Sequence, residues 1–482
     1  MSLPKPYVLL SIEGNEWGVY MEKRKRSLAI DMLSGSMWDK ILLYALPVAA
    51  TGILGQLFNA SDVAIVGNFA STDKVAAVAA VGANGPVIGL VLNLFIGIAL
   101  GANVVIANAI GRGDRETVSR AVHTSIVASV LGGFIVMLIG QLLAKPVLMM
   151  LNVPDDVFPL AMTYMRIYLL GLPVIFLYNF ESAIFRSVGD TKTPLIALAV
   201  SGVLNVILNI FFVTVLDMTV DGVAVATVIA NLVSSVILGR KLLKSELSIH
   251  IDLKNLRIDW KILWRILKIG LPAGIQSAVF SLSNIIISSA VNSLGKVTMA
   301  ASSAGFNVEI MAYYILNSFG QACTTFVGQN YGAAQIDRCR KTLKLCIIEN
   351  IIVTGITVLI MLLSGRFLIG LFNSDPEVIE IGFMRLKIVY TSYIFCLLYE
   401  VMSAYMRGYG ISLVPAILTM LGVCGIRITW IYTVFPMSRT FETIMTVYPI
   451  SLAATSVLIF IALIIYRPSK RYDHIVLDSE HT

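Results

Sequence analysis

Ile41-Leu-Leu-Tyr-Ala-Leu-Pro47 begins the first long apolar stretch of the chain, and Ile266-Leu-Lys-Ile-Gly-Leu-Pro272 begins an equivalent stretch 225 positions later. Asn59 and Asn284 keep the same offset. Three further pairs lie 221 positions apart: Arg186 and Arg407, Gly189 and Gly410, and Pro194 and Pro415. Matches at nearly constant spacing predict that the chain contains two copies of one structural unit.

The composition indicates that both units lie in a membrane. Of 482 residues, 57% are hydrophobic and 13% are charged, whereas soluble chains average about 45–50% and about 25%. The apolar residues form blocks of about 20, the length of a helix that spans a bilayer. These features exclude a soluble enzyme, a disordered chain and a disulfide scaffold, and they predict an all-α polytopic membrane protein.

Breaks between the apolar blocks predict twelve spans, six in each unit. The first six are 41–66, 84–110, 121–143, 158–180, 193–216 and 222–239, and the second six are 266–292, 304–329, 342–363, 383–405, 412–434 and 443–466. Because six is even, both units insert in the same orientation and form two pseudo-symmetric six-helix bundles. We expect an N-lobe at 41–239 and a C-lobe at 266–466, with cytoplasmic segments at 1–40, 240–265 and 467–482.

The basic residues predict the orientation of the spans. With the amino terminus in the cytoplasm, 27 of the 36 Lys and Arg lie in cytoplasmic segments and 5 lie outside. This asymmetry satisfies the positive-inside rule and places both termini in the cytoplasm. The net charge of +7 is therefore explained by topology and by anionic lipid headgroups, and not by nucleic acid.

No pattern for catalysis, metal binding or nucleotide binding stands out. The five cysteines form no C-x-x-C pair, the four histidines are scattered, and no Walker phosphate loop is present. We therefore expect no enzymatic activity and no cofactor. The first 36 residues predict no cleavable signal peptide, and Met21, which precedes the basic run 23–26, is a second candidate start.

The order of several short motifs resembles the multidrug and toxic compound extrusion (MATE) family. The motifs are the two Leu-Pro openings, Val66-Gly67, Ala76-Ala-Val-Ala-Ala-Val-Gly82, Arg186-Ser-Val-Gly-Asp190, Val327-Gly-Gln-Asn-Tyr-Gly332 and Tyr448-Pro-Ile-Ser451. The resemblance covers about 40 to 460. It implies two lobes that form a V around a central cleft, in a monomer of the bacterial plasma (inner) membrane. It also implies export of amphipathic, often cationic drugs or endogenous metabolites, driven by inward proton or sodium flow.

Five carboxylates fall within predicted spans: Asp62, Glu181, Glu309, Glu349 and Glu400. An ionisable side chain at membrane depth is costly and suggests a function. Glu181, Glu349 and Glu400 lie near cytoplasmic span ends beside basic loops, so ion pairing is the simpler interpretation of these three. Asp62 lies about five residues, or roughly 7 Å, from the outer end of its span.

Three polar side chains share the depth of Asp62 in the N-lobe. Asn205 and Asn209 lie on one face of the fifth predicted span, and Thr227 lies on the sixth. Asn and Thr also hold membrane helices together at about 0.6 kcal/mol per hydrogen bond, which would explain the amides without any site. That alternative does not explain an acid, so we interpret the four residues as a coupling site.

The family resemblance sharpens this interpretation. The pattern around Asp62 is most similar to the prokaryotic damage-inducible-type branch, in which an acid in the first span, an Asn-x-x-x-Asp pair and a Thr are used. Asn209 replaces the second acid here. A hard cation prefers oxygen ligands with negative charge, whereas a lone desolvated carboxylate holds a proton more readily. The departure therefore favours proton coupling, with Asp62, Asn205, Asn209 and Thr227 as metal ligands if the ion is Na⁺.

Two charged residues of the C-lobe are candidates for the substrate cleft. Glu309 lies near the outer end of its span and resembles an acid of this branch that faces the cleft. It has an alternative role, because Arg385 or Lys387 could form an ion pair with it. Arg427 lies in mid-span and must face protein or water, and the resemblance implies a structural anchor.

Three rival functions remain open at this stage. A lipid-linked saccharide flippase of the same superfamily would need several cationic residues in its cleft. A cation-coupled exporter dedicated to one secondary metabolite is compatible with the same sequence features. A passive channel or receptor-like protein is disfavoured by the duplicated units and the buried acid.

Overall fold

The computed structural model describes residues 28–70, 74–151 and 153–470. These residues form helices and connecting loops, with no strand among them. The second candidate start, Met21, lies outside the described residues, as do the basic run 23–26 and most of the predicted tail 467–482.

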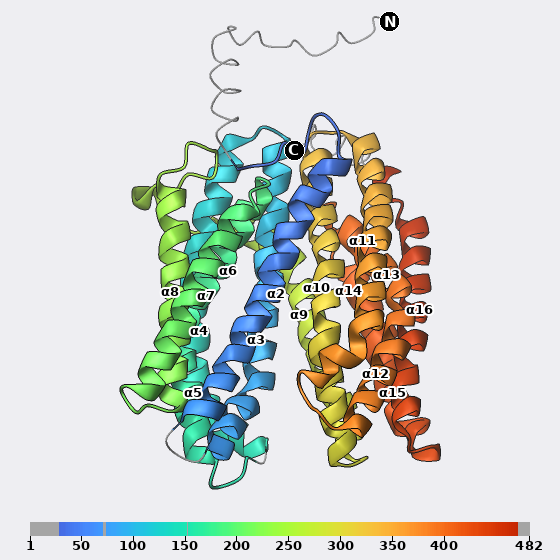
Figure 1. The fold of residues 1–482 in the computed structure, drawn as a ribbon. Coiled ribbons are helices and arrows are strands. Elements are labelled where there is room, and N and C mark those ends of the chain that lie inside the picture. The colour runs from blue at the N-terminus through green and yellow to red at the C-terminus, as the bar shows by residue number, and fades with distance from the viewer. Residues whose placement is uncertain (1–27, 71–73, 152, 471–482) are drawn as a thin grey trace, which may run out of the picture.

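The first half of the chain forms one bundle, which lies to the left in Figure 1. Its helices are α2 (Trp38–Phe69), α3 (Lys74–Gly111), α4 (Arg115–Met150), α5 (Phe158–Leu170), α6 (Leu172–Ser187), α7 (Lys192–Thr214) and α8 (Val220–Leu243). We call this bundle the N-lobe.

The second half forms a bundle beside it, the C-lobe. A short turn, η1 (Leu253–Asn255), precedes it. Its helices are α9 (Trp260–Asn292), α10 (Lys296–Gly332), α11 (Ile336–Gly370), α12 (Pro376–Thr391), α13 (Tyr393–Gly408), α14 (Leu413–Thr419), η2 (Met420–Gly425), α15 (Ile426–Thr433), η3 (Phe435–Met437), α16 (Phe441–Tyr466) and η4 (Pro468–Lys470). The η2 segment is a π-helical turn that joins α14 and α15 into one span.

Twelve spans result, as the apolar blocks predict. Within the described residues, nine helical segments are long and apolar enough to cross a membrane. Two bent pairs, α5 with α6 and α12 with α13, supply two more. The twelfth is α10, which has 37 residues and is more polar because it buries side chains such as Thr325 and Gln329. Most helices extend beyond the predicted boundaries, and α3 begins ten residues before the predicted 84.

Helix bends and glycines with positive φ occur at equivalent positions of the two lobes, 221 residues apart. The α5–α6 pair bends by 50° next to Gly171, and the α12–α13 pair bends by 48° next to Ser392. Gly189 and Gly410 both adopt positive φ, at 90° and 82°, a conformation that glycine accepts at little steric cost. Both pairs lie 221 positions apart, so the repeat extends to the backbone geometry of the broken spans.

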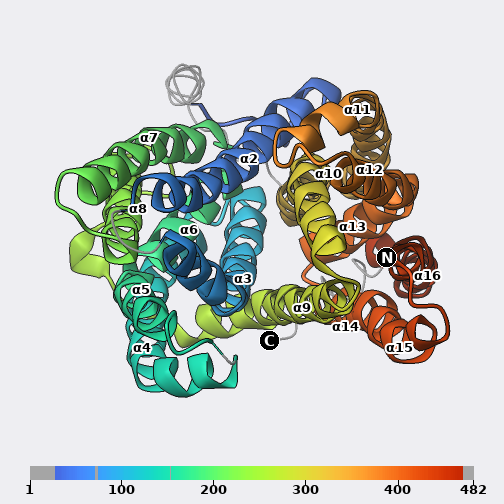
Figure 2. The same ribbon diagram turned by 60° about the horizontal axis from the view of Figure 1, so that its bottom comes forward.

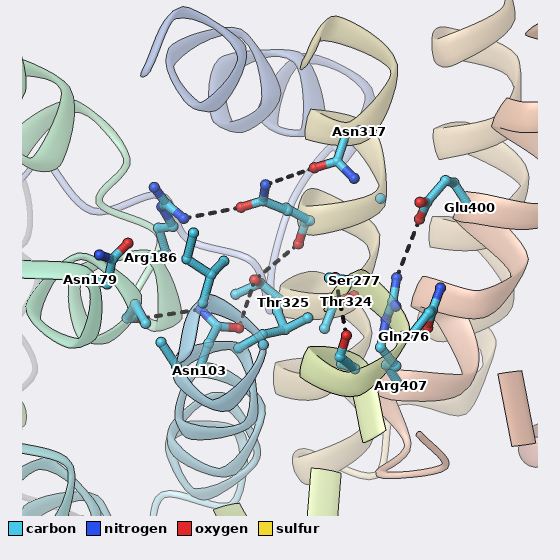
Figure 3. A pocket seen from close by; sticks show the side chains of 18 of the residues that line it. Asn103, Asn179, Arg186, Gln276, Ser277, Asn317, Thr324, Thr325, Glu400 and Arg407 are labelled. Carbon is cyan, nitrogen blue, oxygen red and sulfur yellow. Dashed lines mark hydrogen bonds and ion pairs between the residues drawn. The ribbon is translucent and has the colours of Figure 1, made fainter. Parts of the chain in front are cut away.

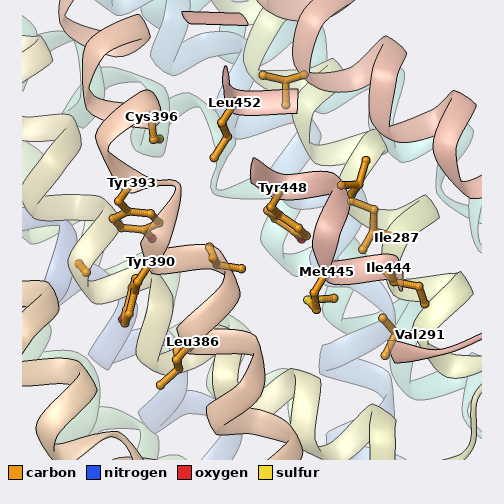
Figure 4. Packing of buried hydrophobic residues seen from close by; sticks show 14 of the residues in the cluster. Ile287, Val291, Leu386, Tyr390, Tyr393, Cys396, Ile444, Met445, Tyr448 and Leu452 are labelled. Atoms are coloured by element: carbon orange, nitrogen blue, oxygen red, sulfur yellow. The ribbon is translucent and has the colours of Figure 1, made fainter. Parts of the chain in front are cut away.

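Each lobe has its own apolar core. The N-lobe core packs residues such as Phe176, Tyr168 and Val223 between α5, α6 and α8. The C-lobe core surrounds Tyr390, Tyr393 and Tyr448, which Figure 4 shows among aliphatic side chains of α9, α12 and α16. Many leucines and isoleucines on the outer faces are exposed, for example Leu142 at 79% and Leu363 at 81%. Lipid covers such surfaces in a membrane protein.

The lobes meet where α3 runs beside α9 (Figure 2). Gly97 and Gly101 of α3 face Gly270 and Gly274 of α9. A methyl group on Gly97 would lie 2.2 Å from the backbone nitrogen of Gly274, and one on Gly101 would lie 2.3 Å from the carbonyl oxygen of Ile266. Small residues therefore allow close backbone contact between the lobes, as is common between membrane helices.

Basic loops gather at one end of the molecule, which we call the basic end. Arg120 forms an ion pair with Asp259, and Arg338 donates to the carbonyl oxygen of Met32 at 3.0 Å. The lobes also touch here, because a methyl group on Gly111 would lie 1.9 Å from the Gln329 carbonyl oxygen. Predicted cytoplasmic loops of both lobes thus share one end of the bundle.

Candidate functional site

Asp62, Asn205, Asn209 and Thr227 form one hydrogen-bonded group in the N-lobe, and we call it the N-lobe site. Asn209 Nδ2 donates to Asp62 Oδ1 at 2.6 Å, and Thr227 Oγ1 donates to Asp62 Oδ2 at 3.1 Å. Asn209 Nδ2 also contacts Asn205 Oδ1 at 3.2 Å, and Asn205 Nδ2 contacts Thr227 Oγ1 at 3.4 Å. The four residues that share a predicted depth in the membrane are therefore in contact in the structure.

Close packing of α2 on α7 positions the N-lobe site. A methyl group on Gly202 would lie 1.8 Å from the ring of Phe58, so only glycine leaves room for this ring. Gly202, Asn205 and Asn209 lie on one face of α7 because they are three and four residues apart. Phe58 and Asp62 share a face of α2 for the same reason. The glycine therefore lets the acid and the amides approach.

The carboxylate of Asp62 is surrounded by neutral groups. Its residue is 5% exposed, and none of the ion pairs found among the described residues includes it. Burying an ionised carboxylate without a counter-charge is costly. Because its partners are an amide and a hydroxyl, Asp62 can accept a proton or bind a cation without displacing a fixed positive charge.

Glu309 of the C-lobe has the opposite environment. Arg385 Nη2 and Nε both lie 2.8 Å from Glu309 Oε2, and the two residues are 9% and 3% exposed. Of the two alternative partners considered from the sequence, Arg385 is the one that binds. Lys387 instead lies over the ring of Phe383, with its Nζ 5.0 Å from the centroid.

Arg427 is buried in the C-lobe and bound by neutral groups. Its Nε donates to Ser451 Oγ at 3.2 Å and its Nη1 to Asn284 Oδ1 at 3.5 Å. The guanidinium lies 4.2 Å from the ring centroid of Tyr448. Glu309 and Arg427 line a cavity of about 530 Å³, including its part open to solvent, whose lining residues all come from the C-lobe.

A larger cavity of about 900 Å³, including its part open to solvent, lies between the lobes, and we call it the central cavity. Helices α2, α3 and α6 line one side, and α9, α10 and α13 line the other. Figure 3 shows its polar residues. They include Asn103, Asn179, Arg186, Gln276, Ser277, Asn317, Gln321, Thr324, Thr325, Glu400 and Arg407.

The family resemblance predicted a central cleft but not the polar residues that line it, because these residues come from six helices. Single amides spaced along apolar helices resemble ordinary helix-packing residues. The one available signal was the repeated pair Arg186 and Arg407, which occupy matching positions at the ends of α6 and α13.

The three acids that we expected to pair with basic loops, Glu181, Glu349 and Glu400, have different partners in the structure. Glu400 is paired with Arg407, at 3.4 Å from Oε2 to Nη2. Glu181 accepts a hydrogen bond from Ser235 Oγ at 2.8 Å rather than from a base. Both carboxylate oxygens of Glu349 are buried without a hydrogen-bond partner in the described part of the chain. Within the described residues, Glu400 is therefore the one of these three acids that forms an ion pair.

Known proteins share the sequence pattern of this chain. The MatE family profile matches residues 47–211 and again 272–433, so each lobe matches separately and the matches begin at Pro47 and Pro272. The probable multidrug resistance protein YoeA of Bacillus subtilis is 28% identical over 402 residues, covering 82% of this chain and 86% of that relative. The probable multidrug resistance protein NorM of Thermotoga maritima is 27% identical, covering 81% and 84%.

Solved structures share the whole architecture. An outward-facing MATE multidrug resistance transporter superposes with a TM-score of 0.83 at 20% identity, covering 93% of this chain and 98% of that one. A transporter of the same superfamily from Pyrococcus furiosus gives 0.84 at 20% identity, with 92% and 98% covered. The profile covers more than half of the chain, and the fold agrees over nearly all of it. The chain therefore belongs to the multidrug and toxic compound extrusion family, whose members are membrane transporters and not enzymes.

Proposed function

We propose that this protein is a secondary active exporter that moves amphipathic drugs or endogenous metabolites out of a bacterial cell, coupled to inward proton flow at Asp62. The observation that carries this proposal is the buried carboxylate of Asp62, whose partners in the described structure, Asn209 and Thr227 among them, are neutral. Support for the substrate class comes from relatives named as multidrug resistance proteins. A more distant relative from Shewanella oneidensis, 22% identical, is named an FAD transporter.

Proton binding at Asp62 would change the contacts between three helices. The ionised carboxylate accepts hydrogen bonds from α7 and α8. Protonation turns one carboxylate oxygen into a donor and makes it a poorer acceptor, so it weakens one of these contacts. The relative stability of two arrangements of the N-lobe then depends on the proton. If substrate binds the two arrangements with different affinity, proton and substrate are thermodynamically coupled.

Sodium is the alternative coupling ion, and the oxygen of Asn209 supports this alternative. Asn209 Oδ1 is buried and has no partner among the described residues. Together with oxygens of Asp62, Asn205 and Thr227, it would complete a set of four oxygen ligands, the type that hard cations prefer. However, the amide of Asn209 directs its N–H at the carboxylate, so this side chain would have to turn before its oxygen could share a cation with Asp62.

The proposal includes a topology and a domain division. Both termini and the basic end lie in the cytoplasm, where anionic headgroups contact the basic loops. Residues 41–239 and 266–466 form the lobes of a monomer that rock about a cleft, and residues 240–265 link them. Glu309 and Arg427 stabilise the C-lobe wall of that cleft, and an exporter dedicated to a single metabolite uses the same machinery.

Transport by the purified full chain in proteoliposomes tests the proposal. We expect a fluorescent amphipathic substrate to accumulate against its gradient when a pH gradient is imposed, and this accumulation to stop when a protonophore collapses that gradient. A sodium gradient at constant pH should drive little transport. Failure to move any test compound under either gradient would refute the exporter function, and sodium-driven transport alone would refute proton coupling.

A further inference from the structure

We propose that the central cavity binds amphipathic compounds that carry an anionic group, such as a carboxylate, sulfonate or phosphate, between Arg186 of the N-lobe and Arg407 of the C-lobe. This inference rests on the proposed export function and specifies its substrate class. It differs from the cationic substrates that the family resemblance implies.

The charged residues of the central cavity leave a positive excess. Its charged lining residues are Arg186, Arg407 and Glu400. Glu400 is fully engaged, because Oε2 faces Arg407 Nη2 at 3.4 Å and Oε1 accepts from Tyr313 at 3.4 Å. A cationic ligand would have to displace Arg407 from this carboxylate. An anionic ligand meets no such competition at Arg186, whose guanidinium has no acidic partner among the described residues.

Arg186 reaches the cavity without an acidic partner. The one hydrogen bond of its guanidinium in the described structure runs from Nη1 to Gln321 Oε1 at 3.1 Å, across the boundary between the lobes (Figure 3). A guanidinium has five N–H donors, so most of its binding capacity is available. Arginine binds carboxylate and phosphate through two parallel hydrogen bonds, which adds both strength and orientation.

Arg407 supplies a second available donor from the opposite lobe. The residue is 8% exposed, and its Nε is buried without a hydrogen-bond partner among the described residues. A buried N–H without an acceptor is destabilising, and an anionic oxygen would satisfy it. Because Arg186 and Arg407 occupy matching positions of the repeat, the two lobes present equivalent cationic groups to one cavity.

The neutral lining leads to the same conclusion. Three amide oxygens of the cavity already accept a hydrogen bond: Asn103 Oδ1 from Thr325, Asn317 Oδ1 from Gln321, and Gln321 Oε1 from Arg186. The guanidinium of Arg186 keeps most of its donors, so a ligand with anionic oxygen acceptors complements this part of the cavity. The apolar wall formed by Ile96, Leu100 and Ala273 suits the non-polar part of an amphipathic compound.

Binding of two dyes with the same ring system and opposite charge tests the inference. The full chain is placed in lipid nanodiscs of phosphatidylcholine, and fluorescein and rhodamine 6G are titrated by fluorescence polarisation, with empty discs as the blank. We expect fluorescein, the anion, to bind saturably and more tightly than rhodamine 6G, the cation. Tighter binding of rhodamine 6G would overturn the inference, and this comparison requires no variant.

Variants then test the assigned residues. Arg186→Gln should weaken fluorescein binding about tenfold or more, the loss expected for a charge-assisted hydrogen bond, and Arg186→Lys should weaken it less. Arg166→Gln removes the same charge from an exposed position of α5 outside the cavity and should leave affinity unchanged. Equal fluorescein affinity in wild type and Arg186→Gln would overturn the assignment, as would loss of rhodamine 6G binding in Glu400→Gln with no effect on fluorescein.

These measurements use no ion gradient, so their outcome is separate from that of the transport assay. If fluorescein binds through Arg186 and no gradient moves it, the substrate class stands and the coupled export function fails. If a proton gradient drives rhodamine 6G out and fluorescein neither binds nor moves, the export function stands and this inference fails.

Discussion

Asp62 and Glu309 are both carboxylates buried inside spanning helices, one in each lobe, but their partners differ. Two neutral donors, Asn209 and Thr227, bind Asp62, whereas the guanidinium of Arg385 binds Glu309 at 2.8 Å. An acid with a fixed counter-charge is held ionised, because neutralising it would leave the buried arginine uncompensated. An acid with neutral partners has no such constraint. This difference underlies our proposal that the N-lobe acid exchanges an ion and that the C-lobe acid stabilises structure.

The largest effect is expected at the N-lobe site. Asp62→Asn keeps the side-chain volume and a hydrogen-bond acceptor but removes the group that takes up a proton. We expect pH-gradient-driven transport in proteoliposomes to fall to the level of protein-free liposomes, while the protein still folds and binds substrate. Asp155→Asn, which changes an exposed loop acid, should transport normally. Gradient-driven transport by Asp62→Asn at the wild-type rate would remove the distinction between the two acids.

The second prediction concerns the ion pair of the C-lobe. Glu309→Gln leaves the charge of Arg385 buried without its counter-ion and should destabilise the protein by about 3–5 kcal/mol. Replacing both residues, with Glu309→Gln and Arg385→Met, should recover much of this loss. Thermal unfolding in detergent measures both effects. Glu380→Gln, which breaks the exposed pair with Arg366, should change the unfolding temperature little.

A pH-independent loss of transport in Glu309→Gln is compatible with a structural role. A shifted pH profile of transport in a stably folded Glu309→Gln variant would assign ion exchange to the C-lobe as well, and it would contradict the comparison.

The third prediction concerns a variant whose N-lobe site should bind a cation more strongly. Asn209→Asp places a second carboxylate next to Asp62, at a position where the amide nitrogen is 2.6 Å from the carboxylate oxygen. Two carboxylates this close do not both ionise unless a proton or a cation lies between them, and Na⁺ supplies that charge. We expect sodium to stimulate transport by this variant several-fold, which is a larger response than in wild type. Equal sodium responses in both proteins would argue against a shared ion position at these residues.

The smallest effect is expected outside the membrane, at Asp259. A hydrogen bond from Arg120 lowers the pKa of the Asp259 carboxyl below its ordinary value of 3.8. A lowered folded-state pKa means that the stabilisation is fully present above about pH 4 and is lost as the pH falls through the folded-state value. Asp259→Asn should therefore leave the pH profile of transport between about pH 5 and pH 8 unchanged. A shift of that profile would show that the linker, and not Asp62, senses protons.

The fold was largely predictable because its signals are local or repeated. Apolar blocks mark most spans, and the Leu-Pro openings at Pro47 and Pro272 mark the repeat. The helix ends were not predicted exactly, since α3 begins at Lys74, ten residues before the predicted span. The bend next to Ser392 was also not predictable, because no proline or glycine lies between 383 and 407.

The N-lobe site and the central cavity also differ in how far the sequence could predict them. The N-lobe site could be assembled from depth alone, since an acid in an apolar helix is rare and Asn205 and Asn209 share a helix face. The partner of Glu309 could not be chosen, because Arg385 and Lys387 are two residues apart and their directions depend on the bend between α12 and α13. The central cavity depends on tertiary packing of both lobes, and no single helix contains enough of its residues to reveal it.

The most direct measurement of the central claim is proton release on substrate binding. Purified protein in weakly buffered solution near neutral pH, with a soluble pH indicator, is mixed with a saturating amount of a transported compound that does not itself titrate there. If proton and substrate favour different arrangements through Asp62, substrate binding releases up to about one proton per protein molecule, because linkage is reciprocal. The account predicts this release in wild type and its absence in Asp62→Asn. Equal proton release by both proteins would contradict the account.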